Sequence, residues 1–145
     1  MSSTAYLLDT NVLSELMREN PAPAVLQWFA GQAASLLHTS TVTQAEVLTG
    51  IALLPAGKRR DTLAQAAQQI FKEDFLGRCI TFDSAAAEHY ALLRAQRQHA
   101  GQPIHTEDAQ IAAIALAAGM ALVTRNTKDF AGIDGLALVN PWQPH

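Results

Sequence analysis

The order of hydrophobic and polar residues divides the chain into short apolar runs of strand length and longer segments with helical spacing. The apolar runs do not alternate with polar residues, which is typical of strands buried on both faces of a parallel sheet. They cover residues 5–9, 36–41, 79–82, 121–124 and 136–139. The helical segments between them cover residues 10–18, 24–34, 43–54, 58–75, 84–101 and 106–118. Strands separated by helices predict an α/β fold in three layers, α/β/α.

Composition sets the class of protein that the chain can form. The sequence has 145 residues, of which 49% are hydrophobic and 16% charged, as expected of one globular domain with its own core. The net charge is −3, so a nucleic-acid partner would need a local basic patch rather than an overall positive field. Lys58, Arg59 and Arg60 form such a run, although a run of this kind can equally be the solvated start of a helix.

The sequence indicates a cytoplasmic protein. Its single cysteine, Cys79, cannot form an internal disulfide, which fits a reducing compartment. No basic region precedes the first apolar run, so a signal peptide is not expected. The longest uncharged apolar stretch, residues 111–123, contains Gly119 and is shorter than the ~18 residues that span a bilayer. We therefore expect no membrane association.

Acidic residues follow the predicted strands at the edge where a parallel sheet binds its ligands. Ligands of open parallel sheets lie at the carboxyl ends of the strands. The acids at or just beyond these ends, or in the first turn of a following helix, are Asp9, Glu46, Asp108 and Asp129. The parallel topology predicts that they share one edge.

Each acid also has a purely structural interpretation. Glu46 could complete a capping box that begins at Thr43, and Asp108 could simply favour the positive end of its helix. Asp108 nevertheless shares the apolar face of that helix, whereas Glu107 is expected to face water. Asp129 could be a loop acid. Asp9 is the hardest to explain structurally, because burying a lone carboxylate costs several kcal/mol unless it is paired or coordinated.

A bound metal ion would neutralise the repulsion among several carboxylates that lie close together. Like charges that converge on a cleft raise each other's pKa values, and a divalent cation removes this conflict. Oxygen ligands without a Cys or His cluster suit Mg²⁺ or Mn²⁺. The chemistry that follows is metal-assisted attack of water on a phosphodiester.

Five segments of the chain together resemble one family. They are LLDTNVLSEL, TVTQAEVLTGIALLPAGKRR, DAQIAAIALAAG, VTRNTKDF and LVNPW, in this order. They look like a PIN-domain ribonuclease of the VapC toxin kind, close to the FitB branch. The resemblance implies a single PIN domain over residues 1–145, with a central five-stranded parallel sheet between helices.

The resemblance also implies an activity and partners. Such a protein is an endoribonuclease with an acidic site for Mg²⁺ or Mn²⁺, and it is the toxin of a toxin–antitoxin pair. A cognate DNA-binding antitoxin of the VapB or FitA kind wraps its C-terminal segment around the toxin and often places an arginine in the acidic cleft. The toxin itself usually forms a homodimer.

Residue by residue, the resemblance assigns the family's first three acids to Asp9, Glu46 and Asp108. The slot of the fourth acid holds Asn126, and Asp129 is the candidate replacement. Residues expected to hold these acids are Thr10, Asn11, Thr124 and Asn126, and those expected to contact RNA are Arg125 and Lys128.

Two other functions compete with that of a nuclease. An aspartyl-phosphate phosphatase usually needs a second acid two residues after the first, where this chain has Asn11. A PIN-fold module that binds antitoxin or RNA without cleavage is opposed by the three matching acids, while Asn126 leaves it open.

Overall fold

A five-stranded parallel sheet forms the centre of the computed structural model, which describes residues 4–143. The strands lie in the order β3-β2-β1-β4-β5, and every neighbouring pair is parallel. Their bounds are Tyr6–Leu8 for β1, Leu37–Ser40 for β2, Cys79–Ile80 for β3, Ala121–Val123 for β4 and Leu138–Val139 for β5. The predicted α/β class and the five parallel strands are confirmed.

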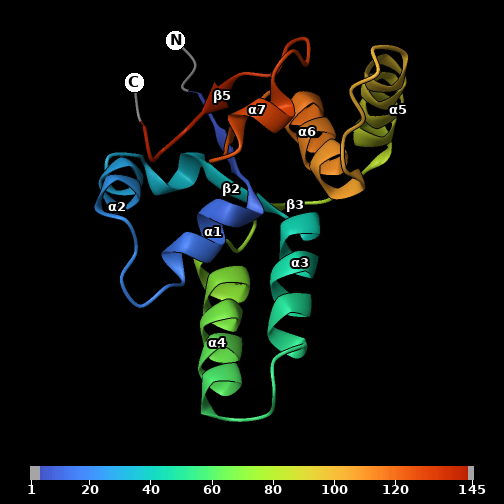
Figure 1. The fold of residues 1–145 in the computed structure, drawn as a ribbon. Coiled ribbons are helices and arrows are strands. Elements are labelled where there is room, and N and C mark those ends of the chain that lie inside the picture. Colours follow the sequence, from blue (N-terminus) through green and yellow to red (C-terminus); the bar gives the residue numbers. More distant parts are fainter. Residues whose placement is uncertain (1–3, 144–145) are drawn as a thin grey trace.

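Helices cover both faces of the sheet (Figure 1). Their bounds are Thr10–Leu16 for α1, Pro23–Ala30 for α2, Thr41–Ala52 for α3, Lys58–Gln69 for α4, Ser84–His99 for α5, Thr106–Ala118 for α6 and Thr127–Phe130 for α7. A 3-10 turn, η1 (Ala34–Leu36), precedes β2, and a π-helical turn, η2 (Ile70–Asp74), prolongs α4. No helix in the described part of the chain is long and apolar enough to cross a membrane.

The core consists of two clusters, one on each face of the sheet. Leu7 of β1 packs with residues of α5, α6 and α7, whereas Leu8, the next residue, packs with residues of α1, α3 and α4. Both leucines are completely buried. Adjacent strand residues point to opposite faces. The three layers therefore follow from β1 being apolar on both sides.

Several predicted helix boundaries agree with the structure. Helix α6 has the predicted bounds and ends at Gly119, whose left-handed φ of 67° is readily adopted by glycine. The segment predicted at residues 58–75 is one continuous helical stretch, because η2 follows α4 directly.

Other boundaries were wrong. Asp83 rather than Ser84 caps α5, with its carboxylate accepting from the Ala86 N–H at 2.9 Å. Helix α3 begins at Thr41 and is capped by Ser40, so the capping box predicted from Thr43 does not form. Helix α7 was not predicted at all. These differences matter for the site, since Ser40 and α7 both lie beside it.

Candidate active site

Asp9 lies where β1 ends and α1 begins, and its carboxylate is the most buried of the four predicted acids. It is 4% exposed. One oxygen caps α1 by accepting from the Thr10 N–H at 2.8 Å. The other accepts from the Thr124 hydroxyl at 2.8 Å and the Asn11 amide at 3.1 Å. Thr10, Asn11 and Thr124, three of the four residues expected to hold the acids, therefore contact Asp9 directly.

The charge of Asp9 is hydrogen-bonded but not neutralised. Within residues 4–143, ion pairing is confined to Arg18 and Glu15, 3.1 Å apart. Burial raises the pKa of Asp9 above its ordinary value, and the three hydrogen bonds only partly oppose this. A buried carboxylate that has only neutral donors around it is suited to bind a cation.

Asn11 and Thr124 also fix the loop that follows β4. The side-chain Oδ1 of Asn11 accepts from the Arg125 N–H at 3.2 Å, and the Thr124 hydroxyl oxygen accepts from the Asn126 N–H at 3.1 Å. The Asp9 N–H in turn donates to the Val123 carbonyl at 2.9 Å. The ends of β1 and β4 are thereby held together.

Glu46 projects from the second turn of α3 rather than from the first. Its carboxylate accepts a hydrogen bond from the Thr10 hydroxyl at 2.6 Å, and that hydroxyl lies 3.1 Å from the Thr43 hydroxyl. Because the Thr43 N–H donates to the Ser40 hydroxyl, Glu46 does not form a capping box with Thr43. The Thr10 contact links α1 to α3 and holds Glu46 beside the residue that follows Asp9.

Asp108 is half-buried in the first turn of α6, while Glu107 is exposed, as the helical face predicts. Burial is the largest cause that raises the pKa of Asp108 to about 6, followed by the negative charges of Asp9 and Asp129. Glu46 contributes in the same direction, and His105 partly opposes the shift. Asp108 therefore lies within electrostatic range of the other three acids.

Asp129 lies on the short helix α7 and is exposed. Its charge raises the pKa values of both Asp9 and Asp108. Asn126 precedes α7 without capping it by its side chain, and its carbonyl accepts from the Asp129 N–H at 3.0 Å. Of the two candidates for the fourth acidic position, Asp129 is thus the one that adds negative charge to the edge.

The donor set at this edge fits a hard divalent cation. Carboxylate, amide and hydroxyl oxygens are ligands that Mg²⁺ and Mn²⁺ prefer. No three acidic, His or Cys side chains of residues 4–143 are close enough together to enclose a metal directly. This arrangement is compatible with Mg²⁺, which keeps several water ligands and binds to proteins through one or two carboxylates.

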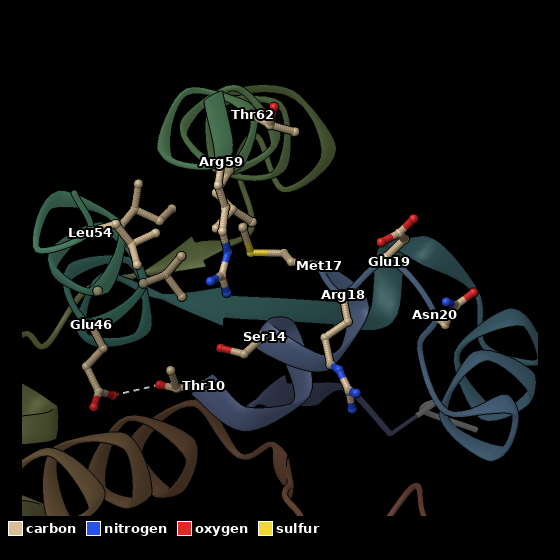
Figure 2. Close-up of a pocket in the computed structure, with 14 residues that line it drawn as sticks. Thr10, Ser14, Met17, Arg18, Glu19, Asn20, Glu46, Leu54, Arg59 and Thr62 are labelled. Atoms are coloured by element: carbon tan, nitrogen blue, oxygen red, sulfur yellow. Dashed lines mark hydrogen bonds between the residues drawn. The ribbon is translucent and has the colours of Figure 1, made fainter. Parts of the chain in front are cut away.

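A groove of about 1020 Å³ runs from this edge between α1, α3 and α4 (Figure 2). Thr10 and Glu46 stand at one end, joined by their hydrogen bond, and Arg59 projects into it from α4. Its apolar lining consists of Met17, Val47, Ile51, Leu54 and Leu63. A second groove of about 630 Å³ lies between α3 and α6, and Glu46 lines both.

The two predicted RNA contacts differ in their surroundings. The Arg125 guanidinium lies over the Trp142 ring, 4.9 Å from its centre, so it packs against the C-terminal segment. Lys128 is exposed on α7, next to Asp129. Lys128 is consequently the freer of the two cations.

Glu15 is a buried acid that sequence reasoning missed. It is 6% exposed, and its spacing of three from buried Val12 was the available signal. The Ala22 N–H donates to its carboxylate at 2.8 Å, and this bond is the main reason that its pKa is lowered, with Arg18 adding to the effect. Glu15 therefore ties α1 to α2, in contrast to Asp9, whose charge remains uncompensated.

A parallel α/β fold with acids gathered at the carboxyl edge of β1 and β4 defines the class of the PIN domain. The model of the PIN domain family matches residues 6–136, and the chain belongs to this family.

Curated relatives match over nearly their whole length. "Plasmid stability protein StbB" of Pseudomonas syringae pv. tomato is 44% identical over 94% of this chain and 98% of its own. "VapC ribonuclease Y4jK" of Sinorhizobium fredii is 41% identical over 95% of this chain and 98% of its own. "Toxin FitB" of Neisseria gonorrhoeae is 36% identical over 94% and 97%.

Solved structures also contain chains that match this one over nearly their whole length. The crystal structure of FitAcB from Neisseria gonorrhoeae contains a chain that is 36% identical, with a TM-score of 0.88 over 95% of this chain and 99% of that one. A FitAB complex bound to a DNA fragment matches with a TM-score of 0.89, at 36% identity over 97% of each chain.

We expect Asp108→Asn to stabilise the metal-free protein at pH 7.5. The raised pKa means that the folded state is destabilised while Asp108 is charged, above pH of about 6, and that this loss disappears as the pH falls toward 3.8. One pKa unit is worth about 1.4 kcal/mol, and solvent screens a half-buried group, so the gain should be about 1 kcal/mol. Urea unfolding with EDTA at pH 7.5 and 4 measures it.

The matched control is Glu107→Gln, one residue earlier and exposed. It should change the unfolding free energy at pH 7.5 by much less than Asp108→Asn does. Equal effects of the two variants, or a destabilising Asp108→Asn, would show that burial and the acidic neighbours do not destabilise the charged form of Asp108.

Proposed function

We propose that this protein is a Mg²⁺- or Mn²⁺-dependent endoribonuclease and the toxin of a toxin–antitoxin pair. The observation that carries the proposal is the buried Asp9 carboxylate, which no cationic side chain among residues 4–143 neutralises and which lies within electrostatic range of Asp108 and Asp129. Relatives named ribonuclease or endonuclease support the reaction class; one is "tRNA(fMet)-specific endonuclease VapC" of Shigella flexneri, 29% identical over 90% of this chain.

Asp9 and Asp108 would hold the cation. When bound, it would supply an activated water and stabilise the charge that develops on the phosphate. Thr124 and Asn11 keep the Asp9 carboxylate fixed through their hydrogen bonds. Thr10 keeps Glu46 at the edge, where Glu46 would complete the ligand set or orient the attacking water. Asp129, with Asn126, would orient that water or help to hold a second cation.

The carboxylates favour the nuclease over a binding module that has lost catalysis. Asp9, Glu46, Asp108 and Asp129 all lie on the edge where a phosphodiester would enter, and the pKa shift of Asp108 couples it to the other three. A module without catalysis would not need to maintain this repulsion. No specific observation favours the alternative.

The proposed partner is a cognate DNA-binding antitoxin of the VapB or FitA kind. Support comes from the neighbouring structures, which are FitAB and VapBC complexes, including one of VapBC2 from Rickettsia felis bound to promoter DNA, 27% identical with a TM-score of 0.77. We further propose that residues 1–145 act as one PIN domain, in the cytoplasm and as a homodimer.

Asp9→Asn or Asp108→Asn should abolish RNA cleavage while the fold remains intact. Either change removes a carboxylate that would hold the cation, whereas Glu88→Gln, on the exposed side of α5, should leave cleavage unchanged. A ribonuclease assay with Mg²⁺ or Mn²⁺ and an EDTA control measures cleavage, and circular dichroism checks folding. Wild-type cleavage by the Asp9→Asn variant, or by the wild-type protein in EDTA, would refute the proposal.

Lys128 and Arg125 are proposed to contact RNA phosphates. Because Lys128 is exposed beside Asp129, Lys128→Ala should weaken RNA binding and lower the slope of log K against log salt by about 0.7, the value for one contact to a single strand. The slope is measured from RNA binding by Asp9→Asn proteins, which are expected to be catalytically inactive, with and without Lys128→Ala. If the slope stays the same, Lys128 is not on the RNA path.

A further inference from the structure

We infer that Arg97, on the outer helix α5, is a positioning residue that sets the place of Asp129 in the acidic edge. The inference rests on the proposed function and concerns how one acid of that site is held. Helix α5 packs on α6 and lies beyond it, away from the sheet (Figure 1), and Arg97 contacts Asp129 through the Asp129 backbone carbonyl.

Arg97 holds the end of α7 through its backbone. One guanidinium nitrogen donates to the Asp129 carbonyl at 2.8 Å and to the Ala131 carbonyl at 3.1 Å. The other donates to the Gln102 carbonyl at 3.4 Å. Arg97 is partly buried, and both of its terminal guanidinium nitrogens donate to backbone carbonyls. Residues 97 and 129 are far apart in the sequence, so this contact is a tertiary brace.

Helix α7 needs such a brace because it is too short to hold its own shape. It comprises Thr127–Phe130, a single turn, and its N-terminal residue Asn126 supplies no side-chain cap. One helical turn is not stable alone. Phe130, 1% exposed, anchors α7 in the core, and Arg97 fixes the backbone on either side of that anchor.

A second arginine extends the brace to α6. Arg94, one turn before Arg97, donates to the Thr106 hydroxyl at 3.4 Å and lies over the Tyr90 ring, 5.5 Å from its centre. Thr106 begins the helix that carries Asp108. The contact of Arg94 with Thr106 is longer than those of Arg97 with the Asp129 and Ala131 carbonyls, and we therefore assign the main positioning role to Arg97.

The arginine side chain suits this task better than lysine. Its planar guanidinium presents several donors in a fixed fork, and one nitrogen reaches two carbonyls at once. A lysine ammonium is a point charge on a flexible stem. Displacing a reacting group by about 1 Å can reduce a rate by about 100-fold, so loosening α7 should affect turnover more than RNA binding.

Arg97→Met removes every donor and keeps an apolar stem. We expect kcat for RNA cleavage to fall by about 10- to 100-fold, as for other residues that orient metal-binding groups, with KM for RNA within about twofold of wild type. Arg97→Lys should recover part of the loss and serves as the test if Arg97→Met folds poorly. Because Arg97 acts through Asp129, Arg97→Met should add little in an Asp129→Asn background.

The matched control is Arg78→Met. Arg78 donates in the same way to the backbone carbonyls of Ala34, Leu37 and Asp74, but beside β3, at the far end of the sheet order from α7. Its loss should lower stability without changing kcat per folded molecule, measured below the unfolding transition of each variant.

The outcomes separate this inference from the proposed function. Wild-type kcat in Arg97→Met, or losses from Arg97→Met and Asp129→Asn that multiply, would overturn the positioning role. If Asp9→Asn is inactive while Arg97→Met equals wild type, only this inference fails. If Asp9→Asn cleaves as well as wild type, the proposed function fails as well.

Discussion

The burial of the Asp9 carboxylate at the end of β1 is the constraint on which the site depends. Its hydrogen bonds come from a hydroxyl, a side-chain amide and a backbone N–H, none of which carries a positive charge. These donors fix the carboxylate without neutralising it, and the same side chains, Thr124 and Asn11, fix the loop beyond β4. Glu15 differs from Asp9 in this respect, because the charge of this second buried carboxylate is paired with Arg18.

The remaining acids are brought to Asp9 by three separate elements. Thr10 connects α1 to Glu46 on α3, the apolar face of α6 turns Asp108 inward, and α7 carries Asp129. The four acids therefore come from parts of the chain that are distant in sequence. Burial is the main cause that raises the pKa of Asp108 to about 6, and repulsion from its acidic neighbours adds to it. A fold that maintains this repulsion provides a natural place for a divalent cation.

The sequence predicts the strands and the longer helices, because apolar runs and helical spacing extend over enough residues to be recognised. Helix α6 and its glycine terminus are the clearest example. Local capping was not predictable in the same way, since Ser84 and Asp83 are both good caps and the backbone decides between them. Helix α7 has four residues, too few for a periodic signal. The Thr10–Glu46 bond joins two helices and has no local signature.

The most direct test of the account is Mn²⁺ binding, measured by electron paramagnetic resonance at pH 7.5. The wild-type protein should bind Mn²⁺ saturably. At pH 6 binding should also release protons, because Asp108, whose pKa is raised to about 6, is then partly protonated before the cation arrives. The Asp9→Asn/Asp108→Asn double variant should lose this binding, while Glu88→Gln should keep it. Equal Mn²⁺ binding by wild type and the double variant, or no saturable binding by either, would contradict the assignment of the acidic edge as a metal site.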